Sequence, residues 1–368
     1  MPSKDLSSSG PKRILALDGG GIRGAITLGF LKKIETILRK RHGNDKLVLS
    51  DYFDLIGGTS TGAIIAGALA IGRDVDYIIN KYRSLGEKIF SETNFLIFKG
   101  LKGKYKSDNL KKGLEEVFEN ITLGSDKIKT GLCIVTKRMD TGSTWPLINF
   151  PTGKYFEYNK GILLRNAVRA STAAPVYFIP EEIDVGSGEK GKFVDGGVSM
   201  FNNPAMLLFL LATLKGFKLN WKTGEKDLLL VSVGTGIFKP TVNVRDVRDD
   251  ILYMGSSIPS SFMYDATLHN QMLLQFFSTC PTRIVIDSEI DDMKDDLLTP
   301  QPLQTYLRYN VRLEENFLND LGFAKKYNIQ SLRKMDDAKN YSHLEEIGNL
   351  GAEKFISEKH FPKEFDLI

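Results

Sequence analysis

Short apolar runs alternate with longer amphipathic segments along most of the chain. Runs typical of buried strands lie at Arg13–Leu17, Tyr52–Ile56, Leu132–Thr136, Phe193–Val194, Leu228–Val233 and Arg283–Asp287. Helices are predicted between them, at Arg23–His42, Thr61–Ile71 and Pro204–Leu214. Strands that end in Gly-rich turns and alternate with helices favour βαβ units. The pattern therefore predicts an α/β fold with a mainly parallel central sheet that is covered on both faces.

The same pattern predicts one domain rather than two. From Ser288 onward the chain is charged and helical in pattern, and no long Gly/Pro-rich linker precedes it. We therefore expect a single domain over 13–368, with 288–368 as its helical C-terminal part. Residues 1–12 contain four serines, one glycine and two prolines and lack an apolar core, so they predict a flexible leader rather than a secretory signal.

Composition excludes several classes of protein. The 368 residues are 42% hydrophobic and 26% charged, as in soluble globular chains, and the net charge of +4 does not indicate nucleic-acid binding. Two distant cysteines, Cys133 and Cys280, are too few for a disulfide framework or a zinc site, and fit a reducing, cytoplasmic compartment. The longest apolar stretch, Ala205–Leu214, is about half of the ~20 residues that a membrane-spanning helix needs.

The first candidate for chemistry is the run Gly58-Thr59-Ser60-Thr61-Gly62, between a predicted strand and a predicted helix. This is the G-x-S-x-G pattern of a nucleophile elbow, in which a tight turn exposes a serine hydroxyl. Ser60 then lies at a helix N-terminus, where free N–H groups favour negative charge. The alternative is an ordinary strand-to-helix turn of small residues.

A second glycine-rich turn, Asp18-Gly19-Gly20-Gly21-Ile22-Arg23-Gly24, follows the first strand. Its spacing fits the dinucleotide motif G-x-G-x-x-G, but the position of the ribose-binding acid falls in a basic helix, and no Lys-Ser/Thr follows Gly24. Consecutive glycines instead expose backbone N–H groups, as an oxyanion hole requires. Arg23 either adds positive charge there or braces the loop.

A general base must accompany a catalytic serine, and the histidines are poor candidates. His42 lies at the basic end of a predicted helix, and the other three, His269, His343 and His360, lie in no recognisable motif. An acid, Asp195, instead follows a predicted strand and precedes Gly196 and Gly197. A carboxylate in this position can accept the hydroxyl proton directly, and burial would make it a better base. The alternative is a turn aspartate before glycines.

Taken together, these motifs resemble the patatin-like phospholipase family. The matches are Asp18–Gly24, Gly58–Gly62 and Asp195–Gly197, with Gly197 where many relatives have alanine. Secondary matches are Arg169–Pro175, Asn202–Pro204, Gly234–Gly236, Tyr306–Arg308 and Met335–Asp337. The resemblance extends from about Arg13 to Gly351.

The resemblance implies a three-layer α/β/α fold and a lipid acyl hydrolase. Ser60 would attack the acyl ester carbonyl of a membrane phospholipid, Asp195 would move the proton, and Gly19, Gly20, Gly21 and Arg23 would form the oxyanion hole. The enzyme would be cytoplasmic and peripheral to the membrane, without nucleic acid or cofactor, and family members need no metal. The acids between Asp287 and Asp296 lack the glycine of a calcium loop and predict a solvated helix face.

Two questions stay open in the sequence. Some bacterial members of the family are anti-phage effectors that a cyclic nucleotide activates, yet no residue pattern in this sequence is typical of nucleotide binding. The sequence also does not indicate an oligomeric state. A nucleotide-binding module and a catalytically silent family member are the alternative functions. The segment Phe90–Lys112 places an apolar run beside six lysines, and from Lys99 to Lys112 these lysines face a single acid, Asp108. It predicts a membrane-contacting rim or, alternatively, a core-anchored loop and a solvated helix face.

Overall fold

The computed structural model describes residues 4–90, 107–175, 177–186, 188–240 and 251–367. Nine strands form one sheet in the order β5-β6-β3-β2-β1-β7-β9-β8, with β4 also paired with β3. The pairings among β3, β2, β1, β7, β9 and β8 are parallel, whereas β4 and β6 pair antiparallel with β3, and β5 with β6. The strands are β1 Lys12–Leu17, β2 Leu55–Thr59, β3 Gly131–Arg138, β4 Ser143–Ile148, β5 Glu181–Asp184, β6 Lys190–Asp195, β7 Leu228–Val233, β8 Ser278–Thr279 and β9 Gln304–Tyr309.

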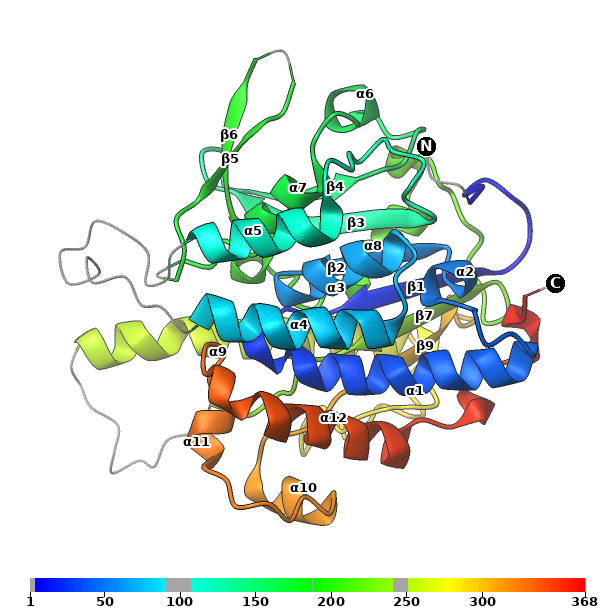
Figure 1. The fold of residues 1–368 in the computed structure, drawn as a ribbon. Helices are drawn as coiled ribbons and strands as arrows, with labels where there is room; N and C mark the ends of the chain where they lie inside the picture. The colour runs from blue at the N-terminus through cyan, green and yellow to red at the C-terminus, as the bar shows by residue number, and fades with distance from the viewer. Residues whose placement is uncertain (1–3, 91–106, 176, 187, 241–250, 368) are drawn as a thin grey trace.

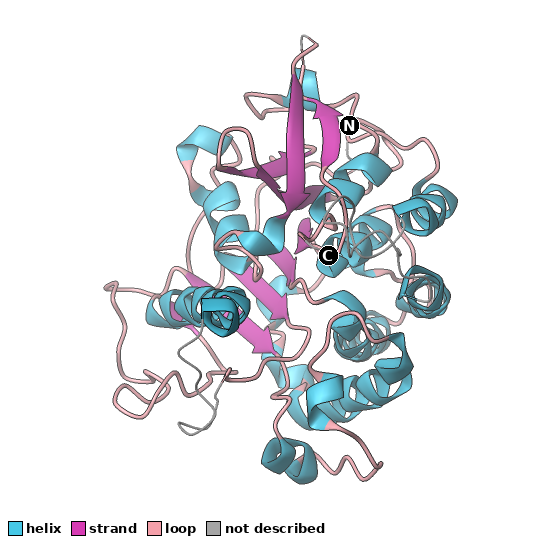
Figure 2. Ribbon diagram, turned by 90° about the vertical axis from the view of Figure 1, so that its left-hand side faces the viewer, coloured by secondary structure: helices cyan, strands magenta, loops and turns pink. Residues whose placement is uncertain are grey.

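Helices cover both faces of this sheet, which confirms the predicted three-layer α/β architecture (Figure 2). Figure 1 shows α4, α1 and α12 running side by side in front of the strands. The helices are α1 Gly24–His42, α2 Leu49–Tyr52, α3 Thr61–Ala70, α4 Val75–Phe90, α5 Ser107–Phe118, α6 Phe156–Asn159, α7 Leu164–Ser171, α8 Ala205–Thr213, α9 Ile251–Phe276, α10 Glu315–Asp320, α11 Ile329–Leu332 and α12 Tyr341–Phe355.

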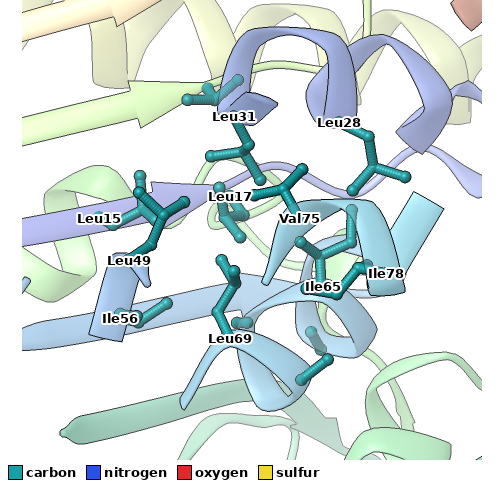
Figure 3. Close-up of a cluster of buried hydrophobic side chains, with 14 of the residues drawn as sticks. Leu15, Leu17, Leu28, Leu31, Leu49, Ile56, Ile65, Leu69, Val75 and Ile78 are labelled. Atoms are coloured by element: carbon teal, nitrogen blue, oxygen red, sulfur yellow. The ribbon is translucent and has the colours of Figure 1, made fainter. Parts of the chain in front are cut away.

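The alternation of side chains along each strand divides the core into two clusters. On β1, Leu15 and Leu17 face the larger cluster, which is formed with α1, α3, α4, α5, α7 and α12. Ile14 and Ala16 face the smaller cluster, formed with α8 and α9. Figure 3 shows part of the larger cluster, where Leu15 and Leu17 lie between Leu31 of α1 and Leu69 of α3. The central strands are therefore buried on both faces, as their continuous apolar runs predict.

Most predicted elements are present, and their errors have identifiable causes. The strand predicted at Tyr52–Ile56 begins only at Leu55, because Leu49–Tyr52 forms the short helix α2. No strand forms at 283–287; the sheet instead continues with β9, inside the segment predicted to be helical. β9 has the sequence QTYLRY, which carries polar residues although all six positions are buried. The apolar pattern could not identify this strand, because its buried polar groups have partners that only the fold supplies: Arg308 pairs with Asp18, and Gln304 Nε2 donates to Ser278 Oγ at 3.1 Å.

The predictions for two polar segments also need correction. Residues 4–12 are anchored rather than flexible: Leu6 is buried, its carbonyl accepts a 2.8 Å hydrogen bond from Trp221 Nε1, and Lys4 Nζ donates to the Asp51 carbonyl. The acids between Asp287 and Asp296 lie in turns and not on a helix face. Within the described ranges, no helix has the length and apolar character to cross a membrane.

Candidate active site

The turn at Ser60 has the strained geometry of an elbow. Ser60 joins β2 to α3 with φ 55° and ψ −121°, a combination that non-glycine residues rarely adopt. The surrounding chain holds it there, because the Ser60 N–H donates to Ser171 Oγ at 2.9 Å and that hydroxyl donates to the Val135 carbonyl at 2.6 Å. The strain is thus offset by contacts from α7 and β3, and the serine side chain is half-buried.

The two glycines of the elbow are required by close backbone contacts. A Cβ atom at Gly58 would lie 2.1 Å from the Gly62 carbonyl oxygen, and one at Gly62 would lie 2.2 Å from the Leu17 carbonyl oxygen. Both distances are far below van der Waals contact, and the obstructing atoms belong to the backbone. The G-x-S-x-G spacing therefore allows α3 to start directly beside the end of β1.

Asp195 ends β6 at the same edge of the sheet. It is buried, and the Gly197 N–H donates to its Oδ1 at 2.7 Å. Burial raises the pKa of Asp195 to about 6, although hydrogen bonds from the Ser60 side chain and the Gly197 amide act in the opposite direction. The fold thus brings together the serine and the acid that the sequence singles out, 135 positions apart.

The glycine loop after β1 contributes fewer free N–H groups than predicted. The Gly19 N–H donates to the Asn202 carbonyl at 3.0 Å, so the prediction that Gly19 is an oxyanion donor is wrong. Within the described part of the chain, the N–H groups of Gly20 and Gly21 form no hydrogen bond. Both residues line the same cavity as Ser60 and Asp195. The usable donors of this loop are therefore Gly20 and Gly21.

The polar side chains of the loop have structural partners. Asp18 accepts hydrogen bonds from Arg308 at 2.8 and 2.6 Å, and both side chains are buried. Burial lowers the pKa of Arg308, but the Asp18 carboxylate raises it above its ordinary value. Arg23 Nε donates to the Gly20 carbonyl at 3.4 Å, and burial lowers the pKa of Arg23 to about 10. Arg23 therefore braces the loop rather than facing Ser60, which decides between the two predicted roles.

A cavity of about 500 Å³ opens at Ser60, and we call it the Ser60 cavity. Apart from Ser60, Asp195 and the glycine loop, its walls are mostly apolar, with contributions from Ile64, Leu85, Leu110, Phe178, Val198 and Met263. A second cavity of about 230 Å³, which we call the Arg333 cavity, adjoins it. The two share Tyr177, Asn202, Met263, Met335 and Asp336, and the second is lined by the cations Arg23, Arg333 and Lys334.

No histidine is among the described residues that line the Ser60 cavity. Elsewhere, His360 Nδ1 pairs with the Tyr309 hydroxyl at 3.0 Å, and the His343 ring packs edge-on against Phe323. In the ranges that the structure describes, no group of three His, Cys, Asp or Glu side chains could hold a metal ion. The acid that the Ser60 side chain contacts by a hydrogen bond is Asp195.

The sequence did not predict the role of three residues of the site. The Ser171 hydroxyl accepts the Ser60 N–H and so positions the serine. The Asn202 carbonyl accepts the Gly19 N–H, and the Met335 carbonyl accepts the Ile22 N–H at 2.8 Å. Each lies in one of the secondary family matches, Arg169–Pro175, Asn202–Pro204 and Met335–Asp337. The family resemblance therefore included these positions, but the sequence alone did not indicate what they do.

Most of the predicted membrane-contacting rim, residues 91–106, lies outside the described residues. The helices on either side of it contribute Leu85 and Leu110 to the Ser60 cavity.

Comparison with known proteins gives a consistent family. A family model described as patatin-like phospholipase matches residues 15–209. A cGAMP-activated phospholipase of Escherichia coli (strain TW11681) is 31% identical over 227 residues, which are 61% of this chain and 62% of the relative. A cUMP-AMP-activated phospholipase of Escherichia coli is 32% identical over 231 residues, 61% of this chain and 65% of the relative. Patatin-T5 of Solanum tuberosum is 28% identical, with 61% and 60% covered. The chain thus spans less than two thirds of each of these relatives.

Proposed function

Because this chain belongs to the patatin-like phospholipase family, we propose that it hydrolyses fatty-acyl esters of membrane phospholipids through Ser60 and Asp195. One observation carries the proposal: a strained serine and a buried acid of raised pKa are hydrogen-bonded to each other and line the same mostly apolar cavity. Apolar walls suit an acyl chain, and the reacting ester carbonyl would then lie beside Ser60. The intact pair argues against a catalytically silent member of the family.

The proton moves between Ser60 and Asp195. As Ser60 Oγ attacks the ester carbonyl, its proton passes to the Asp195 carboxylate, and the tetrahedral intermediate carries the negative charge on the former carbonyl oxygen. Collapse of the intermediate breaks the bond to the alcohol, which takes the proton from Asp195. Water then attacks the acyl-enzyme with Asp195 again as base, and the fatty acid and Ser60 are released. A base with a pKa of about 6 is mostly ionised at pH 7 and can serve both steps.

Backbone N–H groups stabilise the oxyanion in this proposal. Gly20 and Gly21 offer donors without another partner in the described chain, and both line the cavity next to Ser60. The loop is held in place from behind, because the Tyr82 hydroxyl donates to the Gly21 carbonyl at 2.5 Å and also bonds to the Thr61 hydroxyl. Fixed donors that need no reorganisation are the usual source of electrostatic stabilisation in acyl transfer.

The Arg333 cavity suits the headgroup of the same substrate. It adjoins the Ser60 cavity and presents three cations, Arg23, Arg333 and Lys334, against the acids Asp18 and Asp336. Asp18 is occupied by Arg308, so the cations of this cavity outnumber the acids that remain. A phospholipid with its acyl chain in the Ser60 cavity would place its phosphate here, where guanidinium groups bind phosphate well.

We also assign peripheral membrane contact to the segment Phe90–Lys112. The residues on either side of 91–106 support this, since Leu85 and Leu110 line the Ser60 cavity, and Lys111 and Lys112 are exposed. The six lysines of the segment would attract anionic lipids to the mouth of the cavity.

A second element of the proposal is an activator. Two relatives that align over 61% of this chain are named for activation by cGAMP and by cUMP-AMP. We therefore propose that a cyclic nucleotide switches on hydrolysis here, as an anti-phage effector would require.

Mass-spectrometric product analysis on mixed phospholipid vesicles tests the proposal, with and without cGAMP or cUMP-AMP. We expect free fatty acid and lysophospholipid from the parent protein, and at least a thousandfold less from Ser60→Ala, because the nucleophile is lost. Labelling of the parent by a fluorophosphonate, absent in Ser60→Ala, is the matched measurement on the serine itself. Undiminished fatty-acid release by Ser60→Ala would overturn the mechanism.

A further inference from the structure

A third cavity also adjoins the Arg333 cavity, and we call it the Arg312 cavity. It has a volume of about 420 Å³ and shares Ile237, Thr267 and Asn310 with the Arg333 cavity. Four cations line it, Arg283, Arg308, Arg312 and Lys354, and none of its described lining residues is an aspartate or glutamate. A concave site with charges of one sign concentrates ligands of the opposite sign.

Most of these positive charges are not neutralised by the protein. Arg283 donates to the backbone carbonyls of residues 275, 278, 292 and 293, and Lys354 donates to the carbonyl of Asp320. Arg312 is exposed, and no described carboxylate lies within ion-pair distance of Arg283, Arg312 or Lys354. Only Arg308 has an acidic partner, Asp18. Carbonyl partners orient a cation but leave its charge available, so the cavity favours an anion.

The remaining wall narrows the class of anion. Phe317 and Phe355 pack with their ring centroids 5.9 Å apart and line the cavity near Lys354. Thr282 and Ser357 are further lining residues of the cavity. Aromatic rings offer a surface for a flat base, while the arginines suit phosphate oxygens. A volume of this size accommodates an organic ligand rather than a bare ion.

Two structural elements connect this cavity with the proposed active site. Arg308 is one of the lining residues of the cavity, and its guanidinium holds Asp18, the residue directly before the glycine loop. Helix α9 is the second connection, because Thr267 and Gln271 line the Arg312 cavity and Met263, one turn earlier, lines the Ser60 cavity. A ligand that changed the position of Arg308 or α9 would therefore act on the oxyanion donors or on the cavity wall.

We propose that the Arg312 cavity is the binding site for a phosphate-bearing nucleotide that activates hydrolysis at Ser60. The inference rests on the proposed hydrolase function and adds the place and chemistry of its regulation. The nucleotide binds through Arg283, Arg312 and Lys354, and its differential affinity for the active arrangement of Arg308 and α9 shifts the population toward that arrangement.

Binding is measured first on Ser60→Ala protein, so that the result does not depend on turnover. The probes are cGAMP, cUMP-AMP and AMP, with inorganic phosphate and glycerophosphocholine as phosphate-bearing controls without a base. The test variant Arg312→Gln/Lys354→Gln removes two exposed cations of the cavity. The control variant Lys46→Gln/Lys326→Gln removes the same charge from exposed positions outside all three cavities.

We expect at least one nucleotide probe to bind, with a dissociation constant about 100-fold higher in the test variant, or about tenfold for each lost charge-assisted contact. The control variant should bind within about twofold of the parent. In protein with Ser60 intact, the same probe should raise fatty-acid release. In the test variant, release with the probe should be no higher than release without it.

Three outcomes would overturn the inference. They are no binding by any nucleotide probe, equal weakening in the test and control variants, and binding of phosphate or glycerophosphocholine as tightly as of the nucleotides. Fatty-acid release that proceeds without nucleotide binding would leave the proposed hydrolase function standing and remove its regulator. Nucleotide binding without any release from vesicles would instead count against the hydrolase function, so the two failures are distinguishable.

Discussion

Arg308 on β9 holds Asp18, at the end of β1, through two hydrogen bonds of 2.8 and 2.6 Å that span 290 residues of sequence. Both side chains are almost completely buried, and Arg308 Nη1 also donates to Ser232 Oγ at 2.7 Å. The family model ends at residue 209, so the residue that anchors the glycine loop, Arg308, lies beyond the matched part of the chain. The position of the proposed oxyanion donors therefore depends on β9.

The first prediction concerns this ion pair. Replacing Arg308 by methionine should lower the free energy of unfolding by about 3–5 kcal/mol, because the Asp18 carboxylate is left buried without its partner. The double variant Asp18→Asn/Arg308→Met should recover a large part of this loss, since no uncompensated charge remains. Urea denaturation of the two variants measures both effects. A single variant as stable as the parent would show that the pair does not hold the loop.

A second prediction follows if Ser60 and Asp195 act as one unit. Asp195→Asn should lower kcat about as far as Ser60→Ala, and the double variant should be little worse than either, because the effects of one catalytic unit are not additive. Steady-state hydrolysis of a soluble short-chain ester gives the three values.

Histidine variants and a metal chelator serve as the controls for this prediction. Replacement of His42, His269, His343 or His360 by alanine should leave turnover largely intact, and EDTA should have no effect. Loss of activity on a histidine replacement, with Asp195→Asn active, would indicate a triad instead. Activity lost to EDTA and restored by calcium would contradict a metal-free reaction.

The third prediction is a pH dependence. Asp195 must be ionised to accept the Ser60 proton, and burial raises its pKa to about 6. The value of kcat/KM should therefore rise with pH through a single ionisation near 6 and reach a plateau above about 7. An exposed aspartate would place this rise near pH 4. A pH profile on a soluble ester distinguishes the two, and a rise near pH 4 would contradict a raised pKa of Asp195.

A fourth prediction concerns the stability of Asp195→Asn. The folded-state pKa of about 6 lies above the ordinary value of 3.8, so ionisation of Asp195 opposes folding. This cost is absent below about pH 4 and fully present above pH 6, where it is on the order of 2–3 kcal/mol. Asp195→Asn should consequently be more stable than the parent at pH 8 and equally stable at pH 4. Denaturation at the two pH values tests this, and a destabilised variant at pH 8 would contradict it.

The fifth prediction concerns the segment Phe90–Lys112. Replacing Lys99, Lys102, Lys104 and Lys106 by glutamine should weaken hydrolysis of anionic vesicles, because each lysine near such a surface contributes about 1 kcal/mol of attraction. Cleavage of a soluble short-chain ester should stay nearly unchanged, and high salt should reduce vesicle hydrolysis by the parent in the same way. Vesicle flotation gives the binding directly. Equal flotation and equal hydrolysis by both proteins would return the segment to a solvated helix face.

Much of the site could be predicted because its candidate catalytic residues lie in short local sequence motifs. The elbow at Ser60 needs glycines two positions on either side, since any Cβ there would meet backbone atoms within about 2 Å, and this requirement is visible as G-x-S-x-G. The apolar runs of β1, β2, β3 and β7 are equally local, because a central strand is buried on both faces. The α/β class, the elbow and the candidate acid could thus be derived from the sequence.

What the sequence left undecided depends on contacts between distant segments. Gly19 belongs to the same motif as Gly20 and Gly21, yet the Asn202 carbonyl occupies its N–H, and only the fold brings residue 202 there. The strand β9 was not predicted because an arginine is rarely buried in a strand, and Arg308 can be buried here only because it pairs with Asp18. The raised pKa of Asp195 and the cation-lined Arg312 cavity likewise arise from burial and from the meeting of separate elements. The local sequence determined which residues are chemically suited to be nucleophile, base and oxyanion donors. Tertiary packing decided which N–H groups are free, which charges are paired and where the cavities lie, because the burial of a group and its distant hydrogen-bond partners are set only when the chain folds.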